Sequence, residues 1–238
     1  MNSFFDGSGN NIVVESEMNA SVTDFWADAF STCICIGDSV TDGVTVGAGS
    51  RTEPFPYPTR LAKMTGWTIK NAGEAGVTAL GWWQSHFSKY DYTHYQVVLI
   101  ELGYNSGLTD TLDTDCTGAD YTAYADTNTG GYCKIIEGIK AANANAYIVP
   151  IISPGFSESV ANVVKKIATK YSLPVIDLRD VTYINLQHAK FHTKADGTVN
   201  DYTHLTAMGY LAKAKLVHLY LGEIISNDIV NVNNIATA

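Results

Sequence analysis

Charged side chains are scarce in this sequence. Asp, Glu, Lys and Arg make up 16% of the 238 residues, against about 25% in an average soluble protein. The formal net charge is -9, and Lys and Arg form no cluster anywhere in the chain. Nucleic acids and anionic membrane surfaces attract proteins through concentrated positive charge. We therefore expect neither as a partner.

Long apolar runs are also missing. No run approaches the roughly 20 residues that a membrane-spanning helix needs, so we expect no membrane insertion. The first residues, Met1–Asp6, lack the basic region and the apolar core of a signal peptide. The chain is then either cytoplasmic or exported by another route. Its neutral, polar composition favours an extracellular or particle-borne setting.

Cysteine is rare, with four residues in the chain. Cys33 and Cys35 lie two apart in an apolar run, which places both on one face of a strand and in the core. Cys116 and Cys133 flank a polar segment. If they formed a disulfide, closing that loop would stabilise the fold by about 3 kcal/mol.

No residue pattern indicates a metal or an organic cofactor. The cysteines lack zinc-ligand spacing. Asp113–Gly118 imitates the start of a calcium loop, but Tyr124 stands where the loop requires its closing Glu. His188 and His192 are four apart without an acidic partner. Five histidines carry no motif and are expected in packing or at the surface: His86, His94, His188, His192 and His218.

Apolar segments with strand character alternate along the chain with amphipathic segments. Strands are predicted at 32–37, 67–71, 96–103, 146–152 and 174–178, and helices at 57–64, around 82–87, at 132–142, 160–171 and 205–225. Such alternation is typical of a parallel sheet with helices on both faces. Hydrophobic residues, at 46% of the chain, are sufficient for one sizeable core.

The segments suggest one main domain with three additions. We expect this domain at 31–226, preceded by an N-terminal extension or adaptor at 1–30 that contains a short strand at Ile12–Val14. Residues 107–131 form a long insertion without apolar periodicity, and such insertions tend to be functional or mobile. The Asn-rich residues 227–238 are expected to form a loose tail.

The first strand ends abruptly in Gly37-Asp38-Ser39. The carboxyl ends of parallel strands are the usual ligand side of an open α/β sheet. A serine in this turn also lies near the start of the next helix, where unpaired backbone N–H groups favour an anion. These features suit a nucleophile. The alternative is that the three residues form only a turn, with Ser39 as a helix cap.

Three further polar motifs follow predicted strands or precede the last helix. They are Asn71-Ala72-Gly73-Glu74-Ala75-Gly76, Gly103-Tyr104-Asn105-Ser106 and Asn200-Asp201-Tyr202-Thr203-His204. With Ser39, the order Ser, Gly, Asn and Asp-x-x-His resembles the SGNH hydrolases, also called the GDSL esterase family, from about Thr32 to Tyr220. The resemblance implies a flavodoxin-like three-layer α/β/α sandwich around about five parallel strands, with no cofactor.

The residue types agree with ester hydrolysis. A serine hydroxyl is a weak nucleophile and needs an adjacent base, which His204 can provide by taking the proton and passing it to the leaving group. Asp201 can accept from the other imidazole nitrogen and so orient the ring. Because Asp201 and His204 are three residues apart, one loop can deliver both to Ser39.

The tetrahedral intermediate of such a reaction needs hydrogen-bond donors for its oxyanion. The family resemblance assigns this role to the backbone N–H groups of Ser39 and Gly76 and to the side-chain amide of Asn105. Glycine suits a backbone that approaches the substrate closely. The family's third motif usually ends in Asp, whereas Ser106 follows Asn105 here.

Aromatic residues in or near these motifs are candidates for lining the substrate site. Tyr104 and Tyr202 lie within two of the motifs, and Trp82 and Trp83 follow the Gly76 loop. Aromatic and small polar side chains suit a sugar. We therefore expect hydrolysis of short-chain esters, above all O-acetyl groups on a carbohydrate. The alternatives are a non-catalytic glycan-binding or structural module, or a lipase or thioesterase for longer acyl chains.

Overall fold

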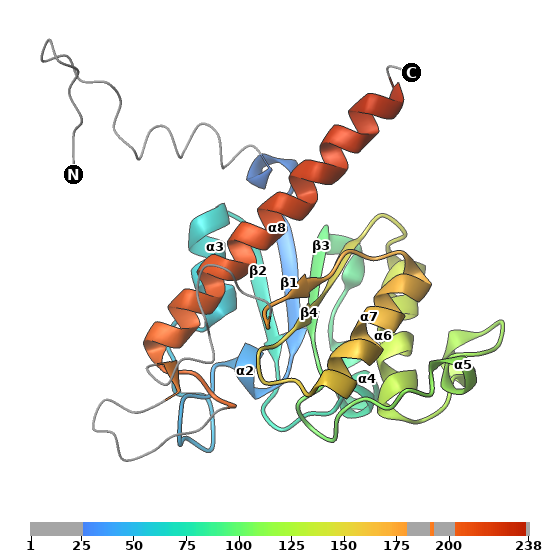
Figure 1. The fold of residues 1–238 in the computed structure, drawn as a ribbon, viewed down its shortest axis with the longest axis horizontal. Coiled ribbons are helices and arrows are strands. Elements are labelled where there is room, and N and C mark those ends of the chain that lie inside the picture. Colours follow the sequence, from blue (N-terminus) through green and yellow to red (C-terminus); the bar gives the residue numbers. More distant parts are fainter. Residues whose placement is uncertain (1–25, 180–190, 193–202, 237–238) are drawn as a thin grey trace, which may run out of the picture.

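A five-stranded parallel sheet forms the centre of the molecule in the computed structural model (Figure 1). Its strands are β1 (Thr32–Gly37), β2 (Thr68–Gly73), β3 (Val97–Glu101), β4 (Tyr147–Ile152) and β5 (Ile176–Asp177). They lie in the order β2-β1-β3-β4-β5, and each neighbouring pair is parallel. This is the flavodoxin-like order, and it confirms the predicted fold class.

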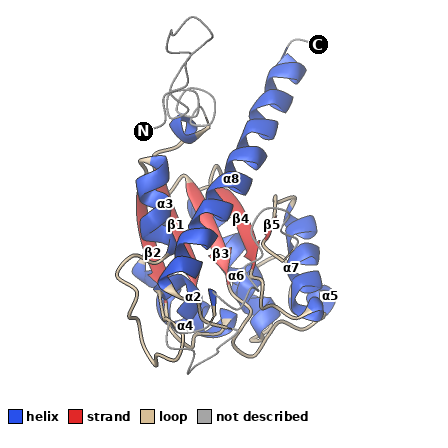
Figure 2. Ribbon diagram, turned by 60° about the vertical axis from the view of Figure 1, so that its left-hand side comes forward, coloured by secondary structure: helices blue, strands red, loops and turns tan. Residues whose placement is uncertain are grey.

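Helices cover both faces of the sheet (Figure 2). The helices are α2 (Ser39–Asp42), α3 (Tyr57–Thr65), α4 (Ala79–His86), α5 (Leu112–Asp115), α6 (Asn128–Ala142), α7 (Glu158–Tyr171) and α8 (Ala207–Ala236). In the described part of the chain they are accompanied by the 3-10 turns η1 (Ala27–Ala29), η2 (Phe87–Lys89), η3 (Tyr92–His94) and η4 (Tyr121–Ala123). Residues of α3 and α8 pack on one face, and residues of α4, α6 and α7 pack on the other.

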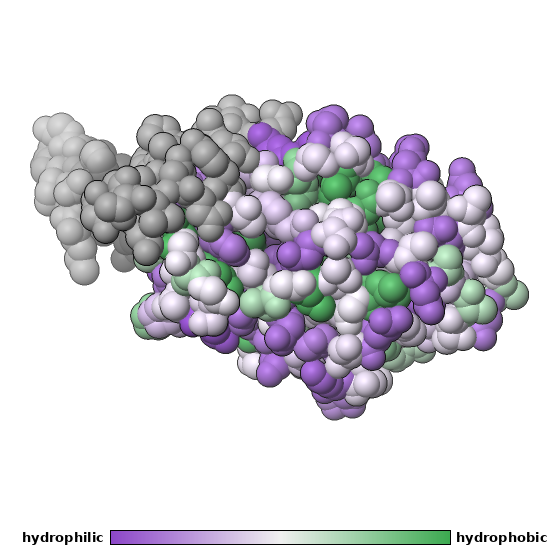
Figure 3. All heavy atoms as spheres, turned by 90° about the horizontal axis from the view of Figure 1, so that it is seen from below, coloured by the Kyte–Doolittle hydropathy of each residue, from purple (hydrophilic) through white to green (hydrophobic). Residues whose placement is uncertain are grey.

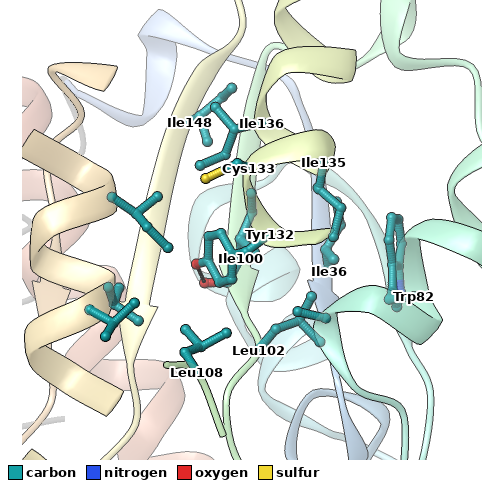
Figure 4. Close-up of a cluster of buried hydrophobic side chains, with 14 of the residues drawn as sticks. Ile36, Trp82, Ile100, Leu102, Leu108, Tyr132, Cys133, Ile135, Ile136 and Ile148 are labelled. Atoms are coloured by element: carbon teal, nitrogen blue, oxygen red, sulfur yellow. Dashed lines mark hydrogen bonds between the residues drawn. The ribbon is translucent and has the colours of Figure 1, made fainter. Parts of the chain in front are cut away.

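The central strand β1 shows how the sequence produces these two layers. Successive strand side chains point to opposite faces. Cys33 and Cys35 are therefore buried against α3 and α8, as expected from their spacing. Ile34 and Ile36 are buried against α4 and α6, on the side shown in Figure 4. A strand covered on both faces has to be apolar throughout, which explains its uninterrupted apolar run.

The structure describes residues 26–179, 191–192 and 203–236. The predicted strand at Ile12–Val14 and most of the predicted N-terminal extension lie outside this part of the chain. Asp201 and Tyr202 also lie outside it, so their assigned roles stay predictions. Within it, no helix is both long enough and apolar enough to cross a membrane.

The insertion is folded onto the domain rather than set apart from it. Leu108, Leu112 and Tyr124 are buried in the core cluster that β3, α6 and α7 share. α6 begins at Asn128, earlier than the predicted residue 132. Glycines in its first turn looked like loop residues, but a Cβ at Gly131 would lie 2.6 Å from the Cα of Leu80. Here glycine permits close contact between α6 and α4.

The last helix is longer than expected. α8 continues through the predicted loose tail to Ala236, and its far end projects beyond the sheet (Figure 1). The Asn-rich composition suggested a loop because asparagine is a weak helix former. However, no glycine or proline follows Gly222 within the helix, so nothing breaks its backbone hydrogen bonding.

Cys116 and Cys133 are both buried, and both are free thiols in the structure. Contact with the Cys133 side chain is the main cause that raises the pKa of Cys116 above its ordinary value. The two side chains therefore meet in the core, one from the insertion and one from α6, without a covalent bond.

Candidate active site

Ser39 lies where β1 ends and α2 begins. Asp38 is the N-cap of α2, and its Oδ1 accepts a hydrogen bond from the backbone N–H of Val40 at 3.0 Å. α2 ends at Gly43, which adopts a left-handed φ of 110°. The helix has only four residues, so it adds little macrodipole to the anion-favouring effect expected at Ser39. Its effect is mainly to hold Ser39 in a tight turn.

His204, the predicted base, lies within reach of this serine. Nε2 of His204 is 3.0 Å from Oγ of Ser39, although the two residues are 165 positions apart in the sequence. This distance suits transfer of the serine proton to the imidazole. The structure thus brings together two of the predicted catalytic residues at the carboxyl end of the sheet.

Two contacts hold the loop that carries His204. Nδ1 of His192 donates to the backbone carbonyl of His204 at 2.9 Å. Leu205 forms a parallel bridge with Thr45, and the backbone N–H of Val46 donates to its carbonyl at 3.4 Å. The loop that carries His204 is therefore fixed to the segment that follows the turn at Ser39. His192, which the sequence placed among packing or surface residues, has this supporting role.

Gly76 lies in the turn after β2 and has a φ of 77°. A Cβ placed on it would meet no atom within 4 Å. No protein atom therefore requires glycine here, and the close approach of substrate to this backbone stays a prediction. The left-handed backbone is the constraint, because side chains disfavour it, and the space beside Gly76 is open to the cavity.

Asn105 follows β3, and its Nδ2 donates to the backbone carbonyl of Val77 at 2.9 Å. An amide nitrogen carries two hydrogens, so this bond orients the group and leaves one donor. Ser106, which replaces the family's Asp, has a φ of 59°. A left-handed serine stores about 1–2 kcal/mol of strain, here in the residue directly after Asn105.

A cavity of about 310 Å³ opens beside these groups. Its lining is Ser39, Val44, Ala48, Gly49, Ala75, Gly76, Asn105 and His204. Four predicted site residues therefore share one cavity. Val44, Ala48 and Gly49 come from the segment after α2, for which the sequence predicts a loop but no role in the site. Its position directly after the serine was the available signal.

Among the described residues, three of the aromatic side chains predicted to line the site are not part of the cavity lining: Trp82, Trp83 and Tyr104. Trp82 is fully buried in the core, and its Nε1 donates to the carbonyl of Ala72 at 3.0 Å (Figure 4). Trp83 packs on Phe87 and Tyr121. Tryptophans at such positions are more often core or helix-face residues, but the place of this pair after the Gly76 loop predicted one of them near the mouth of the site. Helix α4 instead turns them toward the domain interior.

Tyr104 makes its contacts elsewhere in the domain. Its hydroxyl accepts a hydrogen bond from the backbone N–H of Gly155 at 3.0 Å, and its ring packs edge-on against Phe156. These contacts tie the end of β3 to the loop after β4. Tyr104 is thus a structural residue of the motif rather than part of the cavity wall.

A group of buried charged residues surrounds Asp38, the residue directly before Ser39. Asp38, Glu101 and Lys213 have no exposed surface. Burial, and then the neighbouring Glu101 carboxylate, raise the pKa of Asp38 to about 7.

Within the described residues, no three His, Cys, Asp or Glu side chains are grouped to hold a metal ion.

Comparisons with known proteins agree with this architecture. A possible lipase from Chitinophaga pinensis superposes with a TM-score of 0.54 at 20% identity, over 81% of this chain and 98% of that chain. The lipase/acylhydrolase from Enterococcus faecalis gives 0.53 at 16%, over 81% and 96%. A family two carbohydrate esterase from Clostridium thermocellum, solved with cellohexaose, gives 0.52 at 14%, over 82% and 65%.

At these identities, the structural likeness shows the fold alone. No curated protein matches the chain significantly. The sequence model of the GDSL-like Lipase/Acylhydrolase family, however, matches residues 35–212. This range begins in β1 and ends in α8, and it contains the serine turn, the Gly76 and Asn105 loops and the histidine loop. The protein therefore belongs to the GDSL-like lipase/acylhydrolase family of carboxylic ester hydrolases.

Proposed function

We propose that this chain hydrolyses short-chain carboxylic esters, above all O-acetyl groups on a carbohydrate, through an acyl-enzyme on Ser39. The observation that carries the proposal is the 3.0 Å contact between Oγ of Ser39 and Nε2 of His204. Both atoms belong to residues that line a cavity together with Gly76 and Asn105. A nucleophile, its base and the oxyanion donors then face one substrate position.

The reaction follows from this arrangement. Oγ of Ser39 attacks the ester carbonyl carbon while His204 takes its proton. The oxyanion accepts hydrogen bonds from the backbone N–H groups of Ser39 and Gly76 and from the Asn105 amide. Collapse breaks the ester C–O bond, and the leaving alkoxide oxygen receives the proton from His204, so that the alcohol is released. Water then attacks the acyl-enzyme in the same way and releases the acid, with Asp201 as the predicted orienting group.

The size of the cavity supports a short acyl group. Its volume is about 310 Å³, at the small end for ligand sites, and its walls include Val44, Ala48 and Gly49. Figure 3 views the molecule from the side on which β1 leads into α2. Side chains there are mostly hydrophilic or neutral, and hydrophobic ones gather only in small patches. Such a surface favours a polar carrier over a lipid aggregate.

Two structural neighbours support the carbohydrate part of the proposal by analogy only. One was solved with cellohexaose, and the other is a carbohydrate esterase whose active site displays divergent catalytic and non-catalytic binding functions. Trp82, Trp83 and Tyr104, three of the predicted lining residues, do not line the cavity and so do not support a sugar. The proposal of a carbohydrate carrier for the acyl group therefore rests on the polar surface and on this analogy.

The test is a series of p-nitrophenyl esters from acetate to palmitate, assayed beside acetylated xylan and acetylated monosaccharides. We expect kcat/KM to peak at about two to four carbons. Ser39→Ala should abolish turnover and labelling by a fluorophosphonate, whereas Ser159→Ala, at an exposed position in α7, should change neither. A peak at eight carbons or longer would favour a lipase or thioesterase. Absence of turnover and labelling in the wild type would favour a binding module.

A further inference from the structure

Glu101 and Lys213 form an ion pair that is fully buried. Glu101 ends β3, Lys213 lies in α8, and neither side chain has any exposed surface. Transfer of two charges out of water carries a large desolvation cost, and apolar residues of similar size often stabilise a core as well or better. The pair therefore calls for an explanation other than net stability, and its neighbours provide one.

The Glu101 carboxylate has a different partner at each oxygen. Nζ of Lys213 donates to Oε1, and Oγ1 of Thr41 donates to Oε2 at 3.1 Å. Thr41 lies in α2, two residues after Ser39. Lys213 lies in the helix that directly follows the His204 loop. One carboxylate thus connects the two elements that carry the nucleophile and its base.

The surrounding packing gives this connection little freedom. Thr41 is itself fully buried, and a Cβ on Gly37 would lie 2.0 Å from its Oγ1. On the other side, the Lys213 ammonium lies 4.7 Å from the centre of the Tyr57 ring. Neither partner of Glu101 has room to shift without displacing a neighbour. A rigid connection of this kind can fix a distance between two elements.

Electrostatics tie the same cluster to the nucleophile turn. Asp38, adjacent to Ser39, is fully buried, and Glu101 and Lys213 act on it with opposite sign. One ammonium group therefore balances two carboxyl groups immediately behind the serine. Loss of the Lys213–Glu101 contact would alter the field at the turn as well as its position.

We propose that Glu101 is a positioning residue, whose bonds to Thr41 and Lys213 set the distance between Oγ of Ser39 and Nε2 of His204. The proposal rests on the proposed function, because this distance matters only if Ser39 and His204 react together. Misplacement of reacting groups by about 1 Å can cost about 100-fold in rate. The cluster therefore acts on kcat without touching substrate.

The cleanest test removes one hydroxyl. Thr41→Val keeps the shape of the side chain and deletes its bond to Glu101, whereas Thr41→Ser retains the hydroxyl. We expect Thr41→Val to lower kcat for p-nitrophenyl acetate by about 10- to 100-fold with KM within about twofold. Thr41→Ser should restore most of the rate. Active-site titration with a fluorophosphonate corrects each value for folded enzyme.

Thr129→Val is the matched control. Thr129 is fully buried, and its Oγ1 donates to the carbonyl of Thr109 at 2.7 Å. Its loss should lower the melting temperature and leave kcat unchanged. If Thr41→Val behaves like Thr129→Val, the positioning role is wrong and the bond is only structural.

Should Thr41→Val fail to fold, the double variant Glu101→Gln/Lys213→Met removes both charges and retains similar volumes. The proposal expects the same loss of kcat in this variant, and an unchanged kcat would overturn it. A wild-type protein that neither hydrolyses esters nor reacts with the fluorophosphonate would overturn the proposed function, and this proposal with it. Full wild-type activity retained by the variants overturns the positioning role alone.

Discussion

The side-chain amide of Asn105 is held 2.9 Å from the backbone carbonyl of Val77. This bond joins the loop after β3 to the loop after β2, which also contains Gly76. Because the carbonyl accepts one hydrogen of the amide, the second remains for an oxyanion. The two loops that carry the predicted oxyanion donors are therefore oriented by each other.

Asn105→Ala should act on the transition state. Loss of a single oxyanion donor lowers kcat by about 100- to 1000-fold, and KM should change little because the ground-state carbonyl depends less on this donor. Asn143→Ala is the matched control, since its Nδ2 also donates to a backbone carbonyl, that of Tyr95, at 3.0 Å. Steady-state kinetics on p-nitrophenyl acetate distinguish the two. Equal effects of both variants would contradict the oxyanion role.

Asp201→Asn should leave the protein folded and lower kcat by about 10⁴-fold. An amide in place of the carboxylate favours the wrong imidazole tautomer and does not stabilise the imidazolium. The measurement is kcat beside the melting temperature, with Asp110→Asn, an exposed site paired with Lys166 at 2.6 Å, as the control. A rate within tenfold of the wild type would show that another group orients His204.

Asp38→Asn should change how stability depends on pH. Burial and Glu101 raise the pKa of Asp38 from 3.8 to about 7, so the folded state binds this proton more tightly than the unfolded state. The stabilisation that comes from this tighter binding of the Asp38 proton is complete below pH 4 and is lost as the pH rises to about 7. Asparagine keeps the oxygen that caps α2 and stays neutral throughout.

The difference in the free energy of unfolding between Asp38→Asn and the wild type should therefore rise between pH 4 and 7. The slope is at most about 1.4 kcal/mol per pH unit, and the difference is constant above pH 7. Urea denaturation across this range measures it. Asp91→Asn, which changes an exposed capping carboxylate bound to the backbone of Thr93, should show no such rise between pH 5 and 7. Parallel curves for Asp38→Asn and the wild type would refute the prediction.

Trp82→Phe should lower stability without altering substrate binding. It removes the bond from Nε1 to the Ala72 carbonyl, which is buried, and leaves that acceptor unsatisfied at a cost of about 1–3 kcal/mol. KM for p-nitrophenyl acetate and for acetylated xylan should stay within twofold, roughly the scatter of near-neutral changes. Trp83→Phe, at a half-buried site, should have a smaller effect on stability. An increase in KM for acetylated xylan alone would indicate that Trp82 contributes to substrate binding.

The sequence by itself determined the order of the strands and of the longer helices, the place of Ser39 at a strand end and the family. These are local properties. Apolar periodicity distinguishes strands from helices, glycine and small polar residues mark the turns, and the motifs are contiguous. The three-layer fold follows because parallel strands alternating with helices leave few other arrangements.

Only the tertiary structure decided which side chains meet across long separations. Trp82 is buried because α4 packs on α6 through glycine, and no local pattern reports that contact. Glu101 did break an otherwise apolar strand, but its two partners, Thr41 and Lys213, lie 60 and 112 positions away. Such contacts depend on how whole elements pack, and packing is a property of the folded chain rather than of any segment.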